Sequence, residues 1–298
     1  MTRDTFLNLR ANNAGGITVN GVLGVKYNVN SNSVMHVVVD GTGTGVIALD
    51  ATNAYTGSTQ VNAGTLVVGS AGSIHSTSDV RINGASAVFR YEGGTALTRT
   101  VAFGANGGAF FYNSGAKYTG GAGAISADTG DVLGGEGVMG NVTIAGGGVL
   151  RPGKMGNGST GLLTVDSLVL QAGALTEFDI SGAAAFDSIQ SEGAMTLGGS
   201  LHLAFSGLLA NDSRMSLFSA GDSSSLTGNF SGISATGAYE GDFVLEEGIY
   251  RMQSGGQALI FDPTVGELRV SAIPEPSTWM LLGVSALAIL LRRGRQPA

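Results

Sequence analysis

The chain has 298 residues, with 50 glycines, no cysteine and only 12% charged residues. A hydrophobic fraction of 43% excludes an intrinsically disordered chain, and the net charge of −7 argues against a nucleic-acid partner. The lack of cysteine excludes disulfides, thiolate zinc sites and cysteine nucleophiles.

The body of the chain repeats a short unit, which consists of an apolar-alternating strand, a glycine corner and a second strand. The corner glycines Gly148, Gly173 and Gly199 follow one another at nearly equal intervals. A regular repeat of this kind, with strand patterns and no helical pattern, is typical of solenoids. We therefore predict an all-β fold, a right-handed parallel β-helix of roughly eleven coils, whose repeat body covers residues 1–205. Copies of the unit occur at residues 17–24, 59–69, 80–89, 142–150, 168–180 and 195–205.

Alternation within these strands predicts which side chains face the core. Phe178 and Ile180 should point inward, while Glu177 and Asp179 share the outer face. In the next copy we expect an outward His202 between the inward residues Leu201, Leu203 and Phe205.

Two stretches of the body resemble a known family. Residues 53–68, which include Tyr55-Thr56-Gly57 and Ala63-Gly64-Thr65-Leu66, are similar to the autotransporter-associated β-strand repeat. Residues 134–153 are similar to the later part of autotransporter passenger domains. The chain then continues into the tail described below instead of an autotransporter's translocation domain. The resemblance therefore implies the passenger fold and not autotransport.

The middle of the body offers few residues that point to chemistry. Its aromatic side chains favour core packing over an exposed patch for sugar stacking, and the three histidines lie too far apart in sequence to indicate a shared metal site. We expect no metal and no other cofactor. Glu177 and Asp179, with Asp187 and Glu192 as possible companions, are the only carboxylates that suggest a β-helix glycosidase or lyase, and a solvated outer face is the favoured interpretation. The aromatic residues are Phe103, Phe110, Phe111, Tyr112 and Tyr118, and the histidines are His36, His75 and His202.

Residues 206–272 are expected to close the end of the solenoid. The repeat weakens after Phe205, and apolar segments follow at residues 243–245, 249–252, 258–261 and 267–270. We predict that these segments form terminal coils and capping hairpins, because a solenoid needs a cover on its open end.

Residues 273–298 form a tail in three parts, which are a rigid Pro274-Glu275-Pro276 motif, an uncharged stretch at residues 279–291, and a cluster of arginines. A helix over this uncharged stretch rises roughly 20 Å, against about 30 Å of hydrocarbon. We therefore predict a short transmembrane helix, marginal as a permanent anchor and adequate as a temporary one. The residues alone fit either a disposable sorting signal or a plain membrane anchor. The anchor residues are Trp279, Leu281, Leu282, Leu287, Ile289, Leu290 and Leu291, and the stop-transfer residues are Arg292, Arg293 and Arg295.

The order of these three parts resembles the PEP-CTERM sorting domain. In that family an exosortase, a membrane-embedded cysteine transpeptidase of Gram-negative bacteria that make exopolysaccharide, recognises the tail. The resemblance implies that Pro274, Glu275 and Pro276 are recognition residues, that the protein passes through the inner membrane, and that it ends at the cell surface or in the extracellular polysaccharide. Because residues 1–10 lack a secretory signal peptide, we expect the natural start to lie upstream.

Three functions remain open from the sequence. The favoured one is a non-enzymatic structural or adhesive rod of the surface or biofilm matrix. The alternatives are a secreted β-helix lyase or glycosidase that uses acids near Asp179, and a permanently anchored membrane protein.

Overall fold

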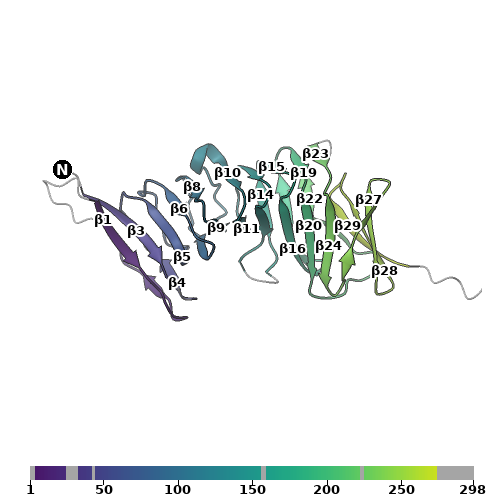
Figure 1. Ribbon diagram of the computed structural model, residues 1–298, viewed down its shortest axis with the longest axis horizontal. Helices are drawn as coiled ribbons and strands as arrows, with labels where there is room; N and C mark the ends of the chain where they lie inside the picture. The colour runs from purple at the N-terminus through teal and green to yellow at the C-terminus, as the bar shows by residue number, and fades with distance from the viewer. Residues whose placement is uncertain (1–3, 25–32, 42–43, 156–158, 222–224, 274–298) are drawn as a thin grey trace, which may run out of the picture.

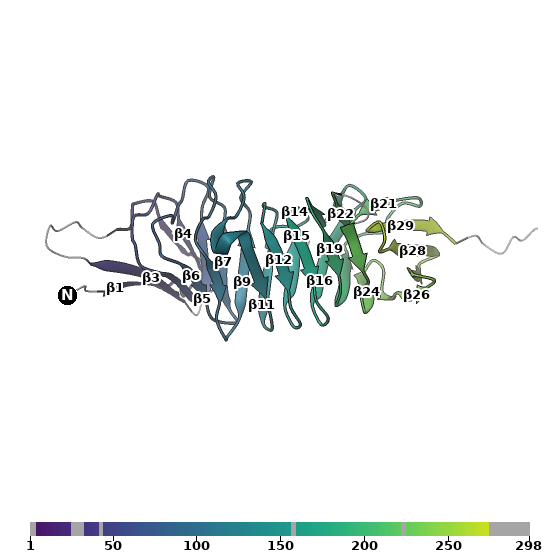
Figure 2. The same ribbon diagram turned by 90° about the horizontal axis from the view of Figure 1, so that it is seen from above.

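The computed structural model describes residues 4–24, 33–41, 44–155, 159–221 and 225–273, and almost all of its regular structure is β-strand. Figures 1 and 2 show the strands following one another along one long axis, from the N-terminal to the C-terminal end. The prediction of an all-β chain with largely parallel sheets is confirmed.

The main sheet takes one strand from each successive segment of the chain, and neighbouring strands in this series are parallel. Shorter strands extend it at β5 and along its edges. The series is β1 (Asp4–Leu9), β3 (Val34–Asp40), β5 (Thr59–Val68), β7 (Ala87–Tyr91), β9 (Gly108–Tyr112), β11 (Asp131–Gly135), β13 (Val149–Pro152), β16 (Leu175–Gly182), β20 (Ser200–Phe205) and β24 (Gly232–Gly237). The shorter strands are β2 (Ile17–Val19), β4 (Val46–Leu49), β6 (Val80–Ile82), β8 (Val101–Phe103), β17 (Ala185–Phe186) and β25 (Gly241–Asp242).

Two further parallel sheets run beside the main sheet, and a 3-10 turn, η1 (Gly120–Gly123), precedes the first of them. One contains β10 (Ala124–Ala127), β12 (Asn141–Ile144), β15 (Ser167–Leu170), β19 (Met195–Leu197) and β23 (Leu226–Gly228). The other contains β14 (Leu162–Val165), β18 (Ser188–Ser191) and β22 (Phe218–Ala220).

Alternation decides which side chains enter the core, as the sequence predicts. Along β16, Phe178 and Ile180 are buried, while Glu177 and Asp179 lie on the outer face. Along β20 the three apolar residues are buried and His202 faces outward.

Glycine corners allow the chain to turn into the main sheet. Gly173 and Gly199 both have positive φ, at 82° and 65°, a conformation that side chains with a Cβ disfavour. A Cβ on Gly199 would also lie 2.0 Å from the carbonyl oxygen of Ala174 in the preceding repeat. The corner therefore requires glycine for two reasons, its backbone angle and the closeness of the neighbouring repeat.

The middle aromatic residues pack mainly inside. Phe89 stacks on Phe110 with ring centroids 5.4 Å apart, and Tyr91 stacks on Tyr112 at 5.5 Å. Each pair occupies matching positions on neighbouring strands, β7 and β9. Core packing is thus confirmed for Phe110, Tyr112 and Tyr118, which are fully buried, and Phe103 is partly buried.

Phe111 differs from its neighbours, because it points to the outer face of β9 and is nevertheless only 4% exposed. Its ring lies over Gly134, where an added Cβ would come within 2.9 Å of a ring carbon.

An antiparallel sheet covers the C-terminal end of the parallel sheets, as Figure 2 shows. The predicted apolar segments form four of its strands in sequential hairpins, and a fifth strand, β21, joins from much earlier in the chain. Parallel pairing meanwhile continues past Phe205 as far as β24. The strands are β21 (Arg214–Ser216), β26 (Val244–Glu246), β27 (Ile249–Ser254), β28 (Gln257–Asp262) and β29 (Glu267–Ala272).

The predicted transmembrane helix, the Pro-Glu-Pro motif and the arginine cluster belong to residues 274–298 and lie outside the described residues. Among the residues that the structure does describe, no helix has the length and apolar character needed to cross a membrane.

Candidate functional site

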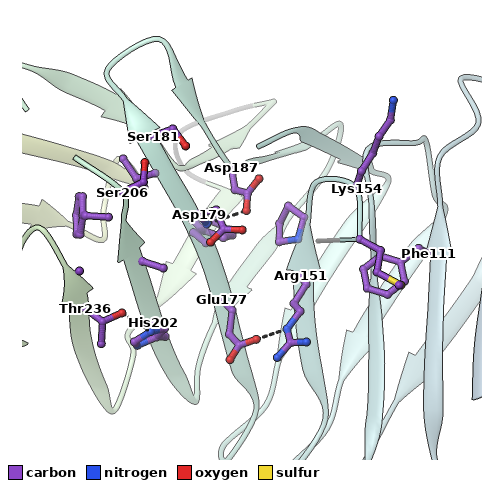
Figure 3. Close-up of a pocket in the computed structure, with 17 residues that line it drawn as sticks. Phe111, Arg151, Lys154, Glu177, Asp179, Ser181, Asp187, His202, Ser206 and Thr236 are labelled. Carbon is purple, nitrogen blue, oxygen red and sulfur yellow. Dashed lines mark hydrogen bonds and ion pairs between the residues drawn. The ribbon is translucent and has the colours of Figure 1, made fainter. Parts of the chain in front are cut away.

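The outer face of β13, β16, β20 and β24 carries a hollow of about 550 Å³, which we call the outer groove (Figure 3). Its floor is formed by outward side chains of these strands. One wall comes from the end of β16, with Ser181, and from the segments that follow β13 and β20, with Lys154, Met155 and Ser206.

Strand register places the floor residues in rows that cross the sheet. Arg151 follows Leu150, the partner of Thr176, and so stands beside Glu177. Glu177 pairs with His202, and His202 pairs with Ser234. Arg151, Glu177 and His202 follow one another along the chain at nearly the same intervals as the corner glycines. Parallel pairing with an almost constant repeat length therefore brings these three residues side by side.

The second row explains why the surface is hollow. Asp179, Ala204 and Thr236 are partners in register on β16, β20 and β24. The short side chain of Ala204 lies between two longer polar ones, so it leaves space above β20.

Two separate sets of polar contacts hold the side chains of the first row. The Nε of Arg151 donates to a carboxylate oxygen of Glu177 (Figure 3). The two ring nitrogens of His202 lie 3.0 Å from the hydroxyls of Ser234 and Thr236. His202 is therefore held between two hydroxyl groups of β24, in an orientation fixed from both sides.

Asp187 is the buried carboxylate of the site, with 2% of its surface exposed. Its Oδ1 accepts a hydrogen bond from the backbone N–H of Gly161 at 2.8 Å, and its Oδ2 accepts one from the N–H of Asp179 at 2.8 Å. Burial raises the pKa of Asp187 to about 7, the two backbone N–H groups oppose this rise, and the charge of Asp179 adds to it. Asp187 thus fixes the segment before β14 to the middle of β16.

The structure brings three of the four predicted acids together, because Glu177, Asp179 and Asp187 all line the outer groove. Glu192 does not line it; it is exposed just after β18.

Each histidine has its own separate partners. His36 contacts Ser58, His75 contacts Thr95, and only His202 lies in the outer groove. In the described ranges, no group of three or more His, Cys, Asp or Glu side chains is placed to hold a metal ion.

Sequence reasoning missed Arg151, Lys154 and Thr236 as groove residues. The separation of Arg151 from Glu177, which nearly equals that of the corner glycines, was the signal that could have identified the first. Lys154 comes from a connecting segment and Thr236 from a region where the repeat had weakened, so neither had such a signal.

Comparison with known proteins identifies one segment. Residues 272–296 match the model of the PEP-CTERM protein-sorting motif, and this segment begins at the last residue of β29. No curated protein matches the chain. The chain therefore carries a PEP-CTERM sorting motif at its C-terminus, which implies an exported protein that an exosortase sorts at the membrane.

Proposed function

We propose that this protein is a non-enzymatic component of the cell surface or extracellular matrix, whose body is a right-handed parallel β-helix and whose tail an exosortase removes. The observation that carries the proposal is the sorting motif at residues 272–296, which begins at the last residue of the last strand of the body.

The junction between body and tail supports cleavage there. β29 pairs with β21 on one side and β28 on the other, and the N–H of Ile273 still donates to the carbonyl of Gly256 at 3.1 Å. Pro274 has no N–H, so the ladder cannot continue through it. Ile273, whose backbone N–H still pairs with the body, thus directly precedes the three recognition residues, and we propose that the exosortase acts on them without unfolding the body.

The stacked sheets support the role of a spacer or adhesive rod. Each long strand of the main sheet pairs with the strands before and after it in the series. In a solenoid of this kind, length grows with the number of coils. A rod of this kind can hold its far end at a distance from the point where it is attached. We propose that release into the exopolysaccharide or attachment within it follows removal of the tail.

A carbohydrate-cleaving enzyme remains the second candidate, and the raised pKa of Asp187 beside Asp179 is the observation that favours it. Against it, both oxygens of Asp187 accept backbone hydrogen bonds, and the Glu177 carboxylate is bound to Arg151. Incubation of the protein with neutral and uronate polysaccharides separates the two proposals. New reducing ends that disappear in Asp179→Asn would establish the enzyme.

The sorting proposal is tested by the intact mass of the protein isolated from its native cells. We expect a mature form that lacks Arg292 to Arg295, and we expect a Glu275→Ala variant to keep its full tail and remain in the membrane fraction. Glu246→Ala, an exposed acid upstream of the motif, is the matched control and should be processed normally. A surface form that retains Arg295 would contradict removal of the tail.

A further inference from the structure

The sorting motif does not explain the polar side chains that line the outer groove. The groove crosses four parallel strands and is lined by both donors and acceptors of hydrogen bonds. We propose that it binds a segment of a neutral polysaccharide, laid across the strands and parallel to the stacking direction. The inference deepens the proposed function, because it rests on the protein's being exposed to polysaccharide outside the cell.

Charge excludes a polyanionic occupant. The Arg151 guanidinium is bound to Glu177, and the Nζ of Lys154 lies 2.9 Å from a carboxylate oxygen of Glu136. The carboxylates of Asp179 and Asp187 complete the lining, so the groove presents no excess of positive charge. The residues before Pro274 carry a net charge of −9, from 12 Lys and Arg against 21 Asp and Glu. A uronate chain would be repelled over the whole body.

The lining suits hydroxyl groups, each of which can donate and accept a hydrogen bond. Glu177 and Asp179 offer acceptors, Arg151 offers further N–H donors, and Thr236 and Ser206 offer hydroxyls. Vicinal hydroxyls of a sugar ring can bridge such neighbouring groups. A ligand without charge also leaves the partly exposed Arg151–Glu177 pair intact, so neither charge loses its partner when the ligand covers the pair.

The spacing of the rows fits a linear sugar chain. Parallel strands lie about 4.8 Å apart, and outward residues in register repeat at that distance. One pyranose unit of an extended chain has a similar length, so successive sugars would meet successive strands. Ala204 provides the depth, because it leaves room for a ring between Asp179 and Thr236.

A peptide strand is a weaker candidate for this face. Peptides that extend a sheet pair with an edge strand, whereas β13, β16 and β20 each have a paired strand on both sides. Side chains alone form the surface that a ligand meets here. An occupant of this face is therefore recognised through side-chain contacts rather than through backbone pairing.

The test measures binding of the full chain in detergent to dextran, mannan and galactan, with alginate as the anionic comparison, by affinity electrophoresis. We expect at least one neutral polysaccharide to retard the protein and alginate to have no effect. Ala204→Phe fills the groove with an outward side chain and should weaken binding at least tenfold, and Asp179→Ala should weaken it as well.

The matched controls are Thr196→Phe, at an outward position of β19 on another sheet, and His75→Ala, which lies outside the groove. Both should bind like the wild type. Absence of binding to all three neutral polysaccharides, stronger binding to alginate, or equal loss in the Thr196→Phe control would each overturn the proposal. Tail removal is measured separately by mass, so failure of polysaccharide binding leaves the sorting proposal standing.

Discussion

Asp187 is the residue whose protonation should affect stability most. Its carboxyl is buried between two backbone N–H groups, and its pKa rises from 3.8 to about 7. The folded protein therefore holds a proton that the unfolded chain releases above about pH 4. The contribution of the protonated Asp187 to the free energy of unfolding is therefore fully present below about pH 4, and it is lost as the pH rises through about 7.

We expect the free energy of unfolding to fall between pH 4 and pH 8, by up to about 4 kcal/mol from this group. Urea denaturation across this range measures the change. Asp187→Asn should flatten the pH dependence, while Asp242→Asn, at an exposed position, should leave it as in the wild type. An unchanged slope in Asp187→Asn would assign the effect to another group, such as Asp131, whose pKa burial raises to about 6.

At the scale of one repeat, the glycine corner sets the limit on sequence change. Gly199→Ala would force a side chain into the left-handed region and against the carbonyl of Ala174. We expect a loss of about 3 kcal/mol in the free energy of unfolding. Gly232→Ala is the control, because an added Cβ there meets nothing within 4 Å. Equal losses in the two variants would show that close approach between repeats is not the cause.

The covering sheet depends on its aromatic contacts with the parallel sheets. Phe261 on β28 is fully buried, and its ring centroid lies 6.3 Å from that of Phe218 and 6.1 Å from that of Phe230. Phe261→Ala should cost about 3–5 kcal/mol of unfolding free energy, measured by thermal or urea denaturation. Val244→Ala, on the exposed edge strand of the same sheet, should change it by less than about 0.5 kcal/mol. Similar behaviour of the two variants would contradict a packed cover.

At this scale the sequence predicted which residues face inward, since alternation along β16 and β20 depends only on local geometry. It did not predict that β21 joins the covering sheet, because Arg214 and Arg269 are brought together only by the path of the whole chain. It also divided β5 at a glycine corner, whereas β5 is one continuous strand whose first half pairs with β3 and whose second half pairs with β4 and β7.

At the scale of the whole molecule, the sequence predicted that a unit repeats. It did not predict how much the length of that unit varies. Fewer residues separate paired positions on β11 and β13 than on β13 and β16. Paired positions on β20 and β24 are separated by more residues than in either of these cases. The core fixes only the strand positions, so the connecting segments can vary in length. The outer groove depends on these segments, because Lys154 and Asp187 come from them. Its acids could therefore be named from the sequence, whereas its shape could not.

The position of β29 between two antiparallel neighbours has a mechanical consequence. If the chain end after Ile273 becomes fixed to an immobile support, tension enters the body along β29. The hydrogen bonds that join β29 to β21 and to β28 are then loaded in shear, all at the same time. They do not break one after another, as they would if the strand were pulled away from one end. The last strand is thus built as a tether that resists pulling.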